Sequence, residues 1–364
     1  MLFRRKKLEE ISWADFHALS QEEQAPYLVQ DNGRPYHVLI AQQFDRDSLD
    51  NLCDLATRIR RIAKSKAGMG FLADLLSHKR TMLYFHQPSS RTFLSFYTAC
   101  QILGIKVGEV RDPSISSEQK GESLEDSVRT FSSYFDMIIM RTPFQGFADK
   151  MAWILSNTDR PLPIINAGSG KDQHPTQALL DIYTLQRSFE HCGGLENKRV
   201  LFCGDLKRGR TVRSLARLLT FYPGVSMVFS APECLQIGED VLAYLKVRGV
   251  SYEVTTEFKS RIAEADAVYM TRMQDEWDRE PGESAKIKME DYYFMGEDLA
   301  KLKRTAVIMH PLPRRKEIDT ACDNDSRAVY WRQMRNGMWI RSALIATVFG
   351  RDTAINSYYT LNMK

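Results

Sequence analysis

The sequence of 364 residues has little of what marks several large classes of protein. Its six cysteines are scattered without a Cys-x-x-Cys pair, so neither a disulfide framework nor a thiolate metal site is indicated. Glycine (20 residues) and proline (13) are sparse, and no low-complexity tract or internal repeat is present, which excludes fibrous, disordered and solenoid proteins. No stretch approaches the roughly 18 apolar residues that a membrane helix needs.

Charge of one sign is also lacking. Lys and Arg number 50 against 46 Asp and Glu, a net charge of +4, so no overall attraction to nucleic acid or to a membrane surface is expected. Four basic residues follow Met1-Leu2-Phe3, and no apolar segment of a secretory signal comes after them. Together with the scattered cysteines, this predicts a protein of the reducing cytoplasm that binds neither nucleic acid nor a membrane.

The hydrophobic pattern predicts an α/β protein. From His37 onward, short apolar runs alternate with longer stretches of helical period, which is typical of βαβ units. The runs are apolar throughout, as expected for parallel strands covered by helices on both faces. We expect strands at residues 81–85, 136–140, 162–166, 199–203, 225–230, 252–255, 267–270 and 305–309. We expect one helix over the apolar stripe from Leu49 to Ile62, and further helices starting near Thr92, Glu122, Gln173 and Thr211.

The length fits about two domains. The strand pattern is interrupted at residues 184–198, where Cys192-Gly193-Gly194 breaks it. We therefore predict two doubly wound parallel-sheet domains, one formed by residues 37–185 together with 336–364 and the other by residues 186–335. Residues 1–36 are an N-terminal extension to which the sequence assigns no chemistry.

Polar residues gather where the predicted strands end. In open α/β sheets, ligands bind beyond the carboxyl ends of the strands, where the unpaired N–H groups of a helix's first turn attract anions. After the strand ending at Phe85 come Ser89, Ser90, Arg91 and Thr92, at the start of a predicted helix. Their hydroxyls, backbone N–H groups and guanidinium match a phosphate dianion. Plain helix capping is the alternative, but a cation in the first turn opposes the helix dipole unless an anion lies beside it.

Two further loops follow the same rule. A glycine-rich loop leads to His174 and Pro175; the proline suits the first helical position and leaves His174 near the N-cap. An imidazole there is biased toward its neutral form and can donate a hydrogen bond to a carbonyl oxygen. After the last strand, Pro311 and Pro313 flank Leu312 and fix the carbonyls of Pro311 and Leu312 as rigid acceptors. A structural histidine and a merely rigid loop are the alternatives.

Several cations also lie at strand ends or in loops, with no matching acidic cluster: Lys120, Arg141, Arg210, and Arg272 together with Gln274. Each one alone is most simply a surface residue. Taken together, they indicate a ligand that carries several negative charges.

In this order, the motifs resemble those of the aspartate and ornithine carbamoyltransferase family, from about His37 to the end of the chain. Six motifs in register carry the resemblance: Ser89-Ser90-Arg91-Thr92, Lys120-Gly121-Glu122, His174-Pro175-Thr176-Gln177, Gly204-Asp205-Leu206-Lys207 with Gly209-Arg210-Thr211, Thr271-Arg272-Met273-Gln274, and His310-Pro311-Leu312-Pro313-Arg314. A single four-residue match would be weak, whereas six in register make the resemblance specific.

The resemblance implies how carbamoyl phosphate would be held. Residues 89–92 would bind its phosphate, and Arg141 would bridge the phosphate and the carbonyl oxygen. Thr92, Arg141 and His174 would polarise the carbonyl while an amine attacks it. The carbamoyl NH2 group would be held by three further groups: the side chain of Gln177 and the carbonyls of Pro311 and Leu312.

For L-aspartate, the resemblance implies that Arg210 takes the α-carboxylate, and that Arg272 and Gln274 take the side-chain carboxylate. The loop with Ser116 and Lys120 would reach a neighbouring subunit, where Lys120 would contact aspartate and take part in catalysis. The protein would then be a homotrimer with shared active sites, each lying between the two domains of a chain. A guanidinium suits a carboxylate and would repel an ammonium, which favours the aspartate branch over the ornithine branch.

The implied reaction transfers the carbamoyl group from carbamoyl phosphate to L-aspartate, giving N-carbamoyl-L-aspartate and phosphate in pyrimidine biosynthesis. It requires neither a metal nor a redox cofactor, so we expect none. A same-fold carbamoyltransferase for a different amino acid and a non-catalytic homologue acting as an assembly partner stay open as alternatives. So does a separate regulatory or pathway partner. A nucleotide-binding oxidoreductase is disfavoured, because no Gly-x-Gly-x-x-Gly follows a strand.

Four positions depart from the family's pattern. Gln87 stands where an acidic residue is common, while Phe93, Gln119 and Trp277 stand at or near positions where basic residues are common. We interpret these departures as changes to domain closure or cooperativity that leave the direct substrate contacts in place.

Overall fold

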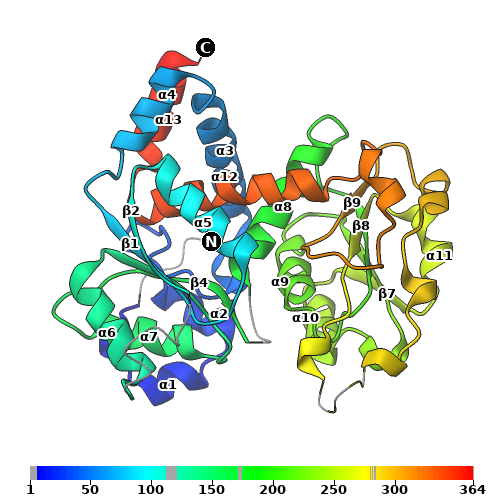
Figure 1. The fold of residues 1–364 in the computed structure, drawn as a ribbon, viewed down its shortest axis with the longest axis horizontal. Helices are drawn as coiled ribbons and strands as arrows, with labels where there is room; N and C mark the ends of the chain where they lie inside the picture. The colour runs from blue at the N-terminus through cyan, green and yellow to red at the C-terminus, as the bar shows by residue number, and fades with distance from the viewer. Residues whose placement is uncertain are drawn as a thin grey trace. The chain divides into compact units, whose positions relative to one another are not determined.

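The computed structural model describes residues 6–111, 121–170, 174–278, 280, 282 and 284–363. The chain forms two α/β units: unit 1, Met1–Leu179 with Gly337–Lys364, and unit 2, Leu180–Asn336. Each unit is built on one sheet whose strands are all parallel, so the predicted fold class is confirmed. The divisions between the units fall inside two helices, α8 (Pro175–Phe189) and α12 (Tyr330–Val348) (Figure 1).

Unit 1 has a four-stranded sheet in the order β2-β1-β3-β4. Its strands are β1 (Arg80–Phe85), β2 (Lys106–Val110), β3 (Met137–Thr142) and β4 (Ile164–Ser169). Helix α5 contacts β1 and β2, α6 contacts β3, and α7 contacts β3 and β4. Its helices besides α8 and α12 are α1 (Trp13–Ala18), α2 (Gln21–Gln24), α3 (Arg46–Ile62), α4 (Lys66–Asp74), α5 (Ser90–Ile102), α6 (Leu124–Tyr134), α7 (Phe147–Ser156) and α13 (Asp352–Asn362).

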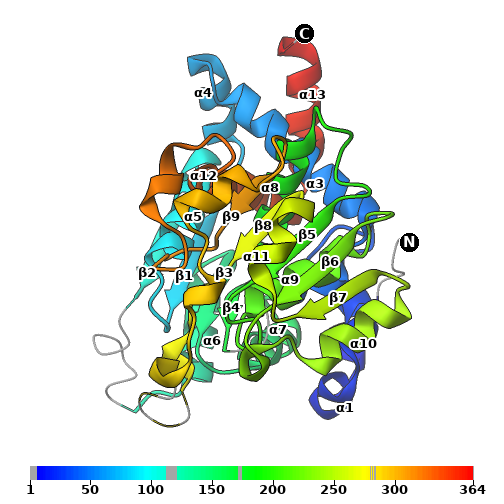
Figure 2. The ribbon, with the colours of Figure 1, turned by 90° about the vertical axis from the view of Figure 1, so that its right-hand side faces the viewer.

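Unit 2 has a five-stranded sheet in the order β7-β6-β5-β8-β9, and Figure 2 shows these strands side by side. The strands are β5 (Arg199–Cys203), β6 (Ser226–Ser230), β7 (Ser251–Thr255), β8 (Ala267–Met270) and β9 (Val307–Met309). The helices are α9 (Arg210–Leu219), α10 (Glu239–Val247) and the short α11 (Phe258–Arg261). Helices α9 and α10 pack on each other, and α10 also contacts β7.

The apolar runs predicted the strands well. Every predicted strand is present, with ends displaced by no more than about three residues, and the predicted helices begin within about two residues of the expected positions. The sequence pattern missed β2, which is an edge strand with half-exposed residues and contains Lys106, Gly108 and Glu109. Because one side of an edge strand faces solvent, its sequence lacks the apolar run that marks a buried strand.

The described part of the N-terminal extension packs into unit 1. Leu8, Phe16 and Leu28 are buried in its hydrophobic core, and the indole N–H of Trp153 donates to the carbonyl of Ile11 at 2.9 Å. Further along, Val38 forms a parallel bridge with Ile165 of β4. The chain therefore covers the edge of the sheet that β4 would otherwise leave open.

His37 lies beside this bridge and is fully buried. Its Nδ1 accepts a hydrogen bond from the Ile164 N–H at 3.1 Å, and its Nε2 lies 3.0 Å from the Ser156 hydroxyl. Since a backbone N–H can only donate, the ring is neutral with its proton on Nε2. Burial lowers the pKa of His37 from 6.5 to about 3.

This burial predicts acid sensitivity. Below about pH 6.5 the unfolded chain binds a proton at His37 that the folded chain does not bind until about pH 3. Folding stability should therefore fall as the pH drops through this window, by up to about 1.4 kcal/mol per pH unit from this one residue. His37→Asn keeps an acceptor for the Ile164 N–H and cannot titrate, so its free energy of unfolding should depend less on pH.

The measurement is urea unfolding at pH 6 and at pH 5 for the wild type, His37→Asn and the exposed-site control His78→Asn. The control should keep the wild-type pH dependence. Equal pH dependence in all three proteins would contradict the assignment to His37.

Candidate functional site

The residues predicted to bind phosphate lie at the carboxyl ends of neighbouring strands of unit 1. Strand β1 ends at Phe85, which is paired in register with Arg141 of β3. Just beyond, the Gln87 N–H donates to the Arg141 carbonyl at 3.2 Å. The chain then enters α5, whose N-cap is Ser89. The start of α5 and Arg141 are thus held at the same edge of the sheet.

The start of α5 has the composition of an anion site. The Ser89 side chain makes no capping hydrogen bond, so plain capping does not account for it. The first turn holds Ser90, Arg91 and the buried Thr92, and no acidic residue. Hydroxyls, backbone N–H groups and a guanidinium at the positive end of a helix favour a bound anion.

Arg141 is buried and is tied to the end of β4. Its exposed fraction is 8%, and its Nη1 donates to the Ala167 carbonyl at 3.1 Å. The neighbouring Asn166 side chain holds the same turn, because its amide N donates to the Ser169 hydroxyl and its carbonyl oxygen accepts the Gly168 N–H at 2.8 Å. The guanidinium is therefore fixed against a backbone turn that is itself fixed.

His174 stands where the sequence predicted it. Helix α8 begins at Pro175, and the His174 carbonyl accepts the N–H groups of Gln177 and Ala178, which makes His174 the N-cap residue. The side chains of His174, Thr176 and Gln177 are all buried. The predicted position of this histidine at a helix N-terminus is confirmed.

Arg341 of α12 belongs to the same region of unit 1, and sequence reasoning missed it. It is buried; its Nη1 donates to the Ser95 hydroxyl at 2.7 Å, its Nη2 to the Thr176 hydroxyl at 3.5 Å, and its guanidinium lies over the Phe96 ring. It thus ties the second turn of α5 to the first turn of α8. The available signal was an arginine inside an otherwise apolar helical stretch, where a buried cation needs partners.

The second set of residues lies at the carboxyl ends of β5, β8 and β9, which are neighbours in unit 2. Arg210 is the first residue of α9, after β5, whereas Arg272 and Gln274 follow β8. Gly204 allows the two loops to approach, since a Cβ there would lie 2.1 Å from the Thr271 carbonyl oxygen and its φ is +115°.

Asp205 and Arg208 hold the backbone of Gln274 from both sides. The Gln274 N–H donates to Asp205 at 3.1 Å, and the Gln274 carbonyl accepts from Arg208 Nη1 at 3.2 Å. Asp205 also accepts the Arg208 N–H, and Arg208 pairs with Asp278 at 2.8 Å. Burial raises the pKa of the Asp205 carboxyl, an effect that these N–H donors partly offset. Sequence reasoning assigned no role to this pair, because 69 residues separate Asp205 from Gln274.

Arg210 and Arg272 lie close to one carboxylate. Arg272 donates to both carboxylate oxygens of Glu276, at 2.8 Å for Nη1. Burial lowers the pKa of Arg210 to about 10; the charge of Glu276 opposes this shift and the charge of Arg272 adds to it. Two guanidinium groups and a carboxylate thus share this corner of unit 2.

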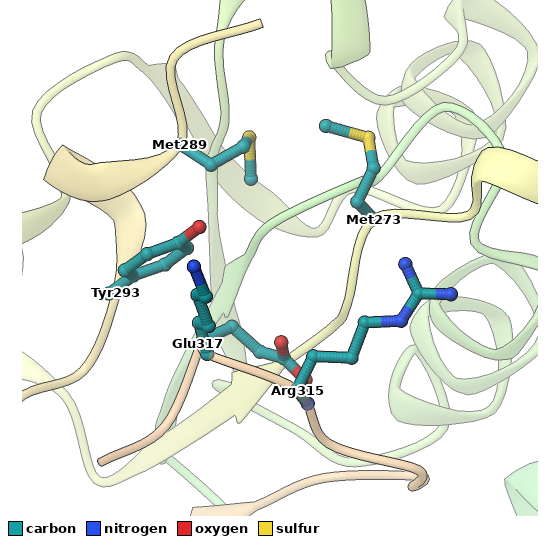
Figure 3. Close-up of a pocket in the computed structure, with 6 residues that line it drawn as sticks. Met273, Met289, Tyr293, Arg315 and Glu317 are labelled. Carbon is teal, nitrogen blue, oxygen red and sulfur yellow. Dashed lines mark hydrogen bonds between the residues drawn. The ribbon is translucent and has the colours of Figure 1, made fainter. Parts of the chain in front are cut away.

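Between the loops after β8 and β9 lies a cavity of about 260 Å³ in unit 2 (Figure 3). Met273, Met289 and Tyr293 form its apolar part, and Arg315, Lys316 and Glu317 its charged part. Arg315 also forms a two-point ion pair with Asp275, at 2.7 and 2.9 Å. The loop that carries Arg272 and Gln274 is thereby joined to the loop that follows Pro311 and Leu312.

Some predicted residues lie outside the described part of the chain, namely Ser116, Gln119, Lys120 and Gln173, and so does the side chain of Trp277. In the part that is described, no three His, Cys, Asp or Glu side chains gather as metal ligands would. Among the same residues, no helix combines the length and the apolar character needed to cross a membrane.

Two family models match the chain. Residues 36–187 match the carbamoyl phosphate-binding domain of aspartate/ornithine carbamoyltransferase, and residues 196–348 match the Asp/Orn-binding domain. Aspartate carbamoyltransferase 1, chloroplastic, of Pisum sativum is 39% identical over 85% of this chain and 77% of its own length. The corresponding Arabidopsis thaliana protein is 38% identical over 85% and 76%.

Solved structures agree with these matches. Trypanosoma cruzi aspartate transcarbamoylase in complex with N-(phosphonacetyl)-L-aspartic acid has a TM-score of 0.75 and 34% identity, covering 85% of this chain and 95% of that one. The catalytic subunit of M. jannaschii aspartate transcarbamoylase has a TM-score of 0.76 and 33% identity, covering 86% and 98%.

The comparisons correct the predicted cytoplasmic location. The relatives in Pisum sativum, Arabidopsis thaliana and Oryza sativa are named chloroplastic. Scattered, free cysteines are expected in any reducing compartment, so they do not distinguish one such compartment from another.

Asp205 and Arg208 form a clamp on the Gln274 backbone, and this clamp yields a prediction. Asp205→Ala leaves the N–H groups of Arg208 and Gln274 without their buried acceptor, so it should lower the free energy of unfolding by about 2 to 4 kcal/mol. Amide hydrogen exchange at Gln274 should become faster. Asp240→Ala removes an exposed ion pair with Arg213 and should cost no more than about 1 kcal/mol. Equal losses in both variants, with slow exchange at Gln274, would contradict the clamp.

Proposed function

Because the chain belongs to the aspartate/ornithine carbamoyltransferase family, we propose that it transfers the carbamoyl group of carbamoyl phosphate to the amino group of L-aspartate with the residues described above. The products are N-carbamoyl-L-aspartate and phosphate, a step of pyrimidine biosynthesis. We assign carbamoyl phosphate to residues 37–185 with 336–364, and aspartate to residues 186–335.

In unit 1, the start of α5 takes the phosphate. Ser89, Ser90, Arg91 and Thr92 offer hydroxyls, N–H groups and a guanidinium at a helix N-terminus without a competing carboxylate. Arg141 bridges the phosphate and the carbonyl oxygen from the end of β3. Its burial strengthens this interaction, because little solvent screens its charge.

The carbonyl is activated by donors that are in place before the reaction. Thr92, Arg141 and His174 aim donors at the carbonyl oxygen, where negative charge develops as the amine nitrogen bonds to the carbamoyl carbon. The bond from that carbon to the phosphate oxygen then breaks. The carbamoyl NH2 group is held by Gln177 and by the carbonyls of Pro311 and Leu312. Because helix starts and buried contacts fix these groups, little reorganisation accompanies the reaction.

One observation carries the choice of aspartate as acceptor. In unit 2, both Nη atoms of Arg272 donate to the carboxylate of Glu276, and the charge of the same carboxylate acts on Arg210. This corner thus has the chemistry that the α- and side-chain carboxylates of aspartate need, with Arg210 for the first and Arg272 with Gln274 for the second. The side-chain ammonium of ornithine would be repelled there.

The departures from the family pattern leave these contacts in place. Phe93 is buried, its ring packs edge-on against Phe85, and the Arg111 guanidinium lies 4.3 Å above it. Packing and a cation–π contact therefore occupy the place where relatives commonly carry a basic side chain. Gln87 has a buried carbonyl oxygen with no hydrogen-bond partner within the described ranges. We propose that these positions affect domain closure rather than substrate contact.

The first test is carbamoylated product formed from carbamoyl phosphate with L-aspartate, L-ornithine or other amino acids. Product is expected with aspartate. Arg91→Ala should lower kcat/KM by about 10²- to 10³-fold, because it removes a charged partner of the phosphate. Arg213→Ala, which breaks an exposed ion pair, should retain wild-type activity. Product with a different amino acid alone would favour the same-fold alternative, and no product with any amine would favour the non-catalytic assembly partner.

We also propose a homotrimer in which Ser116 and Lys120 serve a neighbouring subunit's site. Arg91→Ala and Lys120→Ala would each be inactive alone. Refolded together in equal amounts, they should recover about a quarter of the wild-type sites, because one site in four combines an intact Arg91 with an intact Lys120 from its neighbour. The measurement is activity of the mixture beside its mass by light scattering. No recovery in a mixed trimer would rule out shared sites.

A further inference from the structure

His310 is a buried histidine to which the proposed reaction gives no part. It follows β9 directly and is fully buried. Its Nδ1 accepts the Leu312 N–H at 2.7 Å, and its Nε2 lies 2.8 Å from Oε1 of the buried Glu317. The ring therefore spans the distance between a carboxylate and the backbone of a residue proposed to hold the carbamoyl NH2 group.

These contacts settle the proton's place on the ring. A backbone N–H can only donate, so Nδ1 carries a lone pair, and the proton is on Nε2, where it donates to Glu317. Oε1 of Glu317 also accepts the Arg315 N–H at 2.9 Å. Burial alone would raise the pKa of the Glu317 carboxyl, but the hydrogen bonds that it accepts from the His310 ring and from the Arg315 N–H oppose this effect, and the pKa is lowered. Glu317 is thus an ionised acceptor that keeps the ring in one tautomer.

The backbone of His310 is anchored as well. Its N–H donates to Oε1 of the buried Gln333 at 3.0 Å, and Gln333 donates in turn to Asp181 at 2.6 Å. Asp181 also accepts the Tyr269 hydroxyl at 2.8 Å. A network of buried groups from β8, α8 and α12 therefore fixes the position of the ring.

Leu312 needs such support. Its φ is +56°, in the left-handed region that a residue with a Cβ rarely adopts. Pro311 and Pro313 restrict the backbone on either side of Leu312, but their rings offer no acceptor for the Leu312 N–H. The His310 ring is the group that accepts this N–H, so it helps to set the direction of the peptide units on both sides of Leu312.

We infer that His310, held by Glu317, is a positioning residue that aims the Leu312 carbonyl at the carbamoyl NH2 group. This inference rests on the proposed function. His310 touches no substrate and acts through Leu312. Its loss should weaken the binding of ligands that carry the NH2 group, while leaving the binding of phosphate alone unchanged.

Two substitutions test the roles of the two ring nitrogens, Nδ1 and Nε2, separately. Asn at position 310 places a carbonyl oxygen near the former Nδ1 and can still accept the Leu312 N–H. Gln places its amide near the former Nε2 and can still donate to Glu317, but offers nothing to Leu312. His310→Gln should therefore weaken binding of phosphonoacetamide, a stable analogue of carbamoyl phosphate that keeps the NH2 group, by about tenfold, whereas His310→Asn should stay within about threefold of the wild type.

The measurement is calorimetric titration of each full-length protein with phosphonoacetamide and with inorganic phosphate, which lacks the NH2 group. Phosphate affinity should be the same in all three proteins. A Gln variant that loses affinity for both ligands, or Asn and Gln variants that behave alike, would overturn the inference while leaving the proposed function intact. A wild-type protein that binds neither ligand would overturn the proposed function and this inference with it.

A measurement on the wild type keeps the inference testable even if a variant fails to fold. In protein with 15N-labelled histidine, NMR should show the His310 ring with its proton on Nε2, and phosphonoacetamide should shift its Nδ1 signal more than phosphate does. A proton on Nδ1, or equal shifts with the two ligands, would overturn the inference.

Discussion

The common direction of the strands is the constraint on which the rest of the structure depends. Because all neighbouring strands in both sheets are parallel, their carboxyl ends meet at one edge of each sheet. Each strand must then leave through a loop that enters a helix or turn with unpaired N–H groups. The residues with phosphate or carboxylate chemistry lie at these strand ends, in the loops or in the first helical turns that follow them, at β1, β3 and β4 in unit 1 and at β5, β8 and β9 in unit 2.

The loops share a second feature, which follows from the first. Once a strand has ended, its backbone loses the ladder of hydrogen bonds, and a buried polar side chain supplies partners instead. Asn166 does this within the last residues of β4. Asp205, which follows β5, does it for the loop after β8, and His310 does it after β9. In each case the side chain that holds the loop is distinct from the side chains proposed to meet the substrates. Binding and positioning are thus divided between residues a few positions apart.

The sequence was informative where the signal is local. The apolar runs predicted the buried strands, and Pro175 predicted the start of α8, because period and proline geometry act over a few residues. The edge strand β2 was missed because its half-exposed residues form no apolar run. The packing of Phe16 and Leu28 into unit 1 was missed because it depends on partners far along the chain. The same holds for Asp205 with Gln274 and for Arg341 with Ser95, whose partners only the tertiary fold brings near. Motif residues could be named in advance, whereas the contacts by which Asp205, His310 and Arg341 hold other residues in place could not.

The discontinuity of unit 1 bears on the order in which the chain folds. Its first segment contacts residues that are made much later. The Ile164 N–H donates a hydrogen bond to His37, which lies 127 residues earlier in the sequence, and Arg34 forms an ion pair with Asp352, which lies 318 residues later. Unit 2 is one continuous segment, so all its strands have been synthesised before residues 337–364 are made. We therefore expect synthesis to complete the second unit before the first, because the apolar faces of α3 and α4 are covered by α13 only after residues 352–362 are made. A ribosome that stalls before residue 337 would release a chain with one finished unit and one that is open to chaperones and proteases.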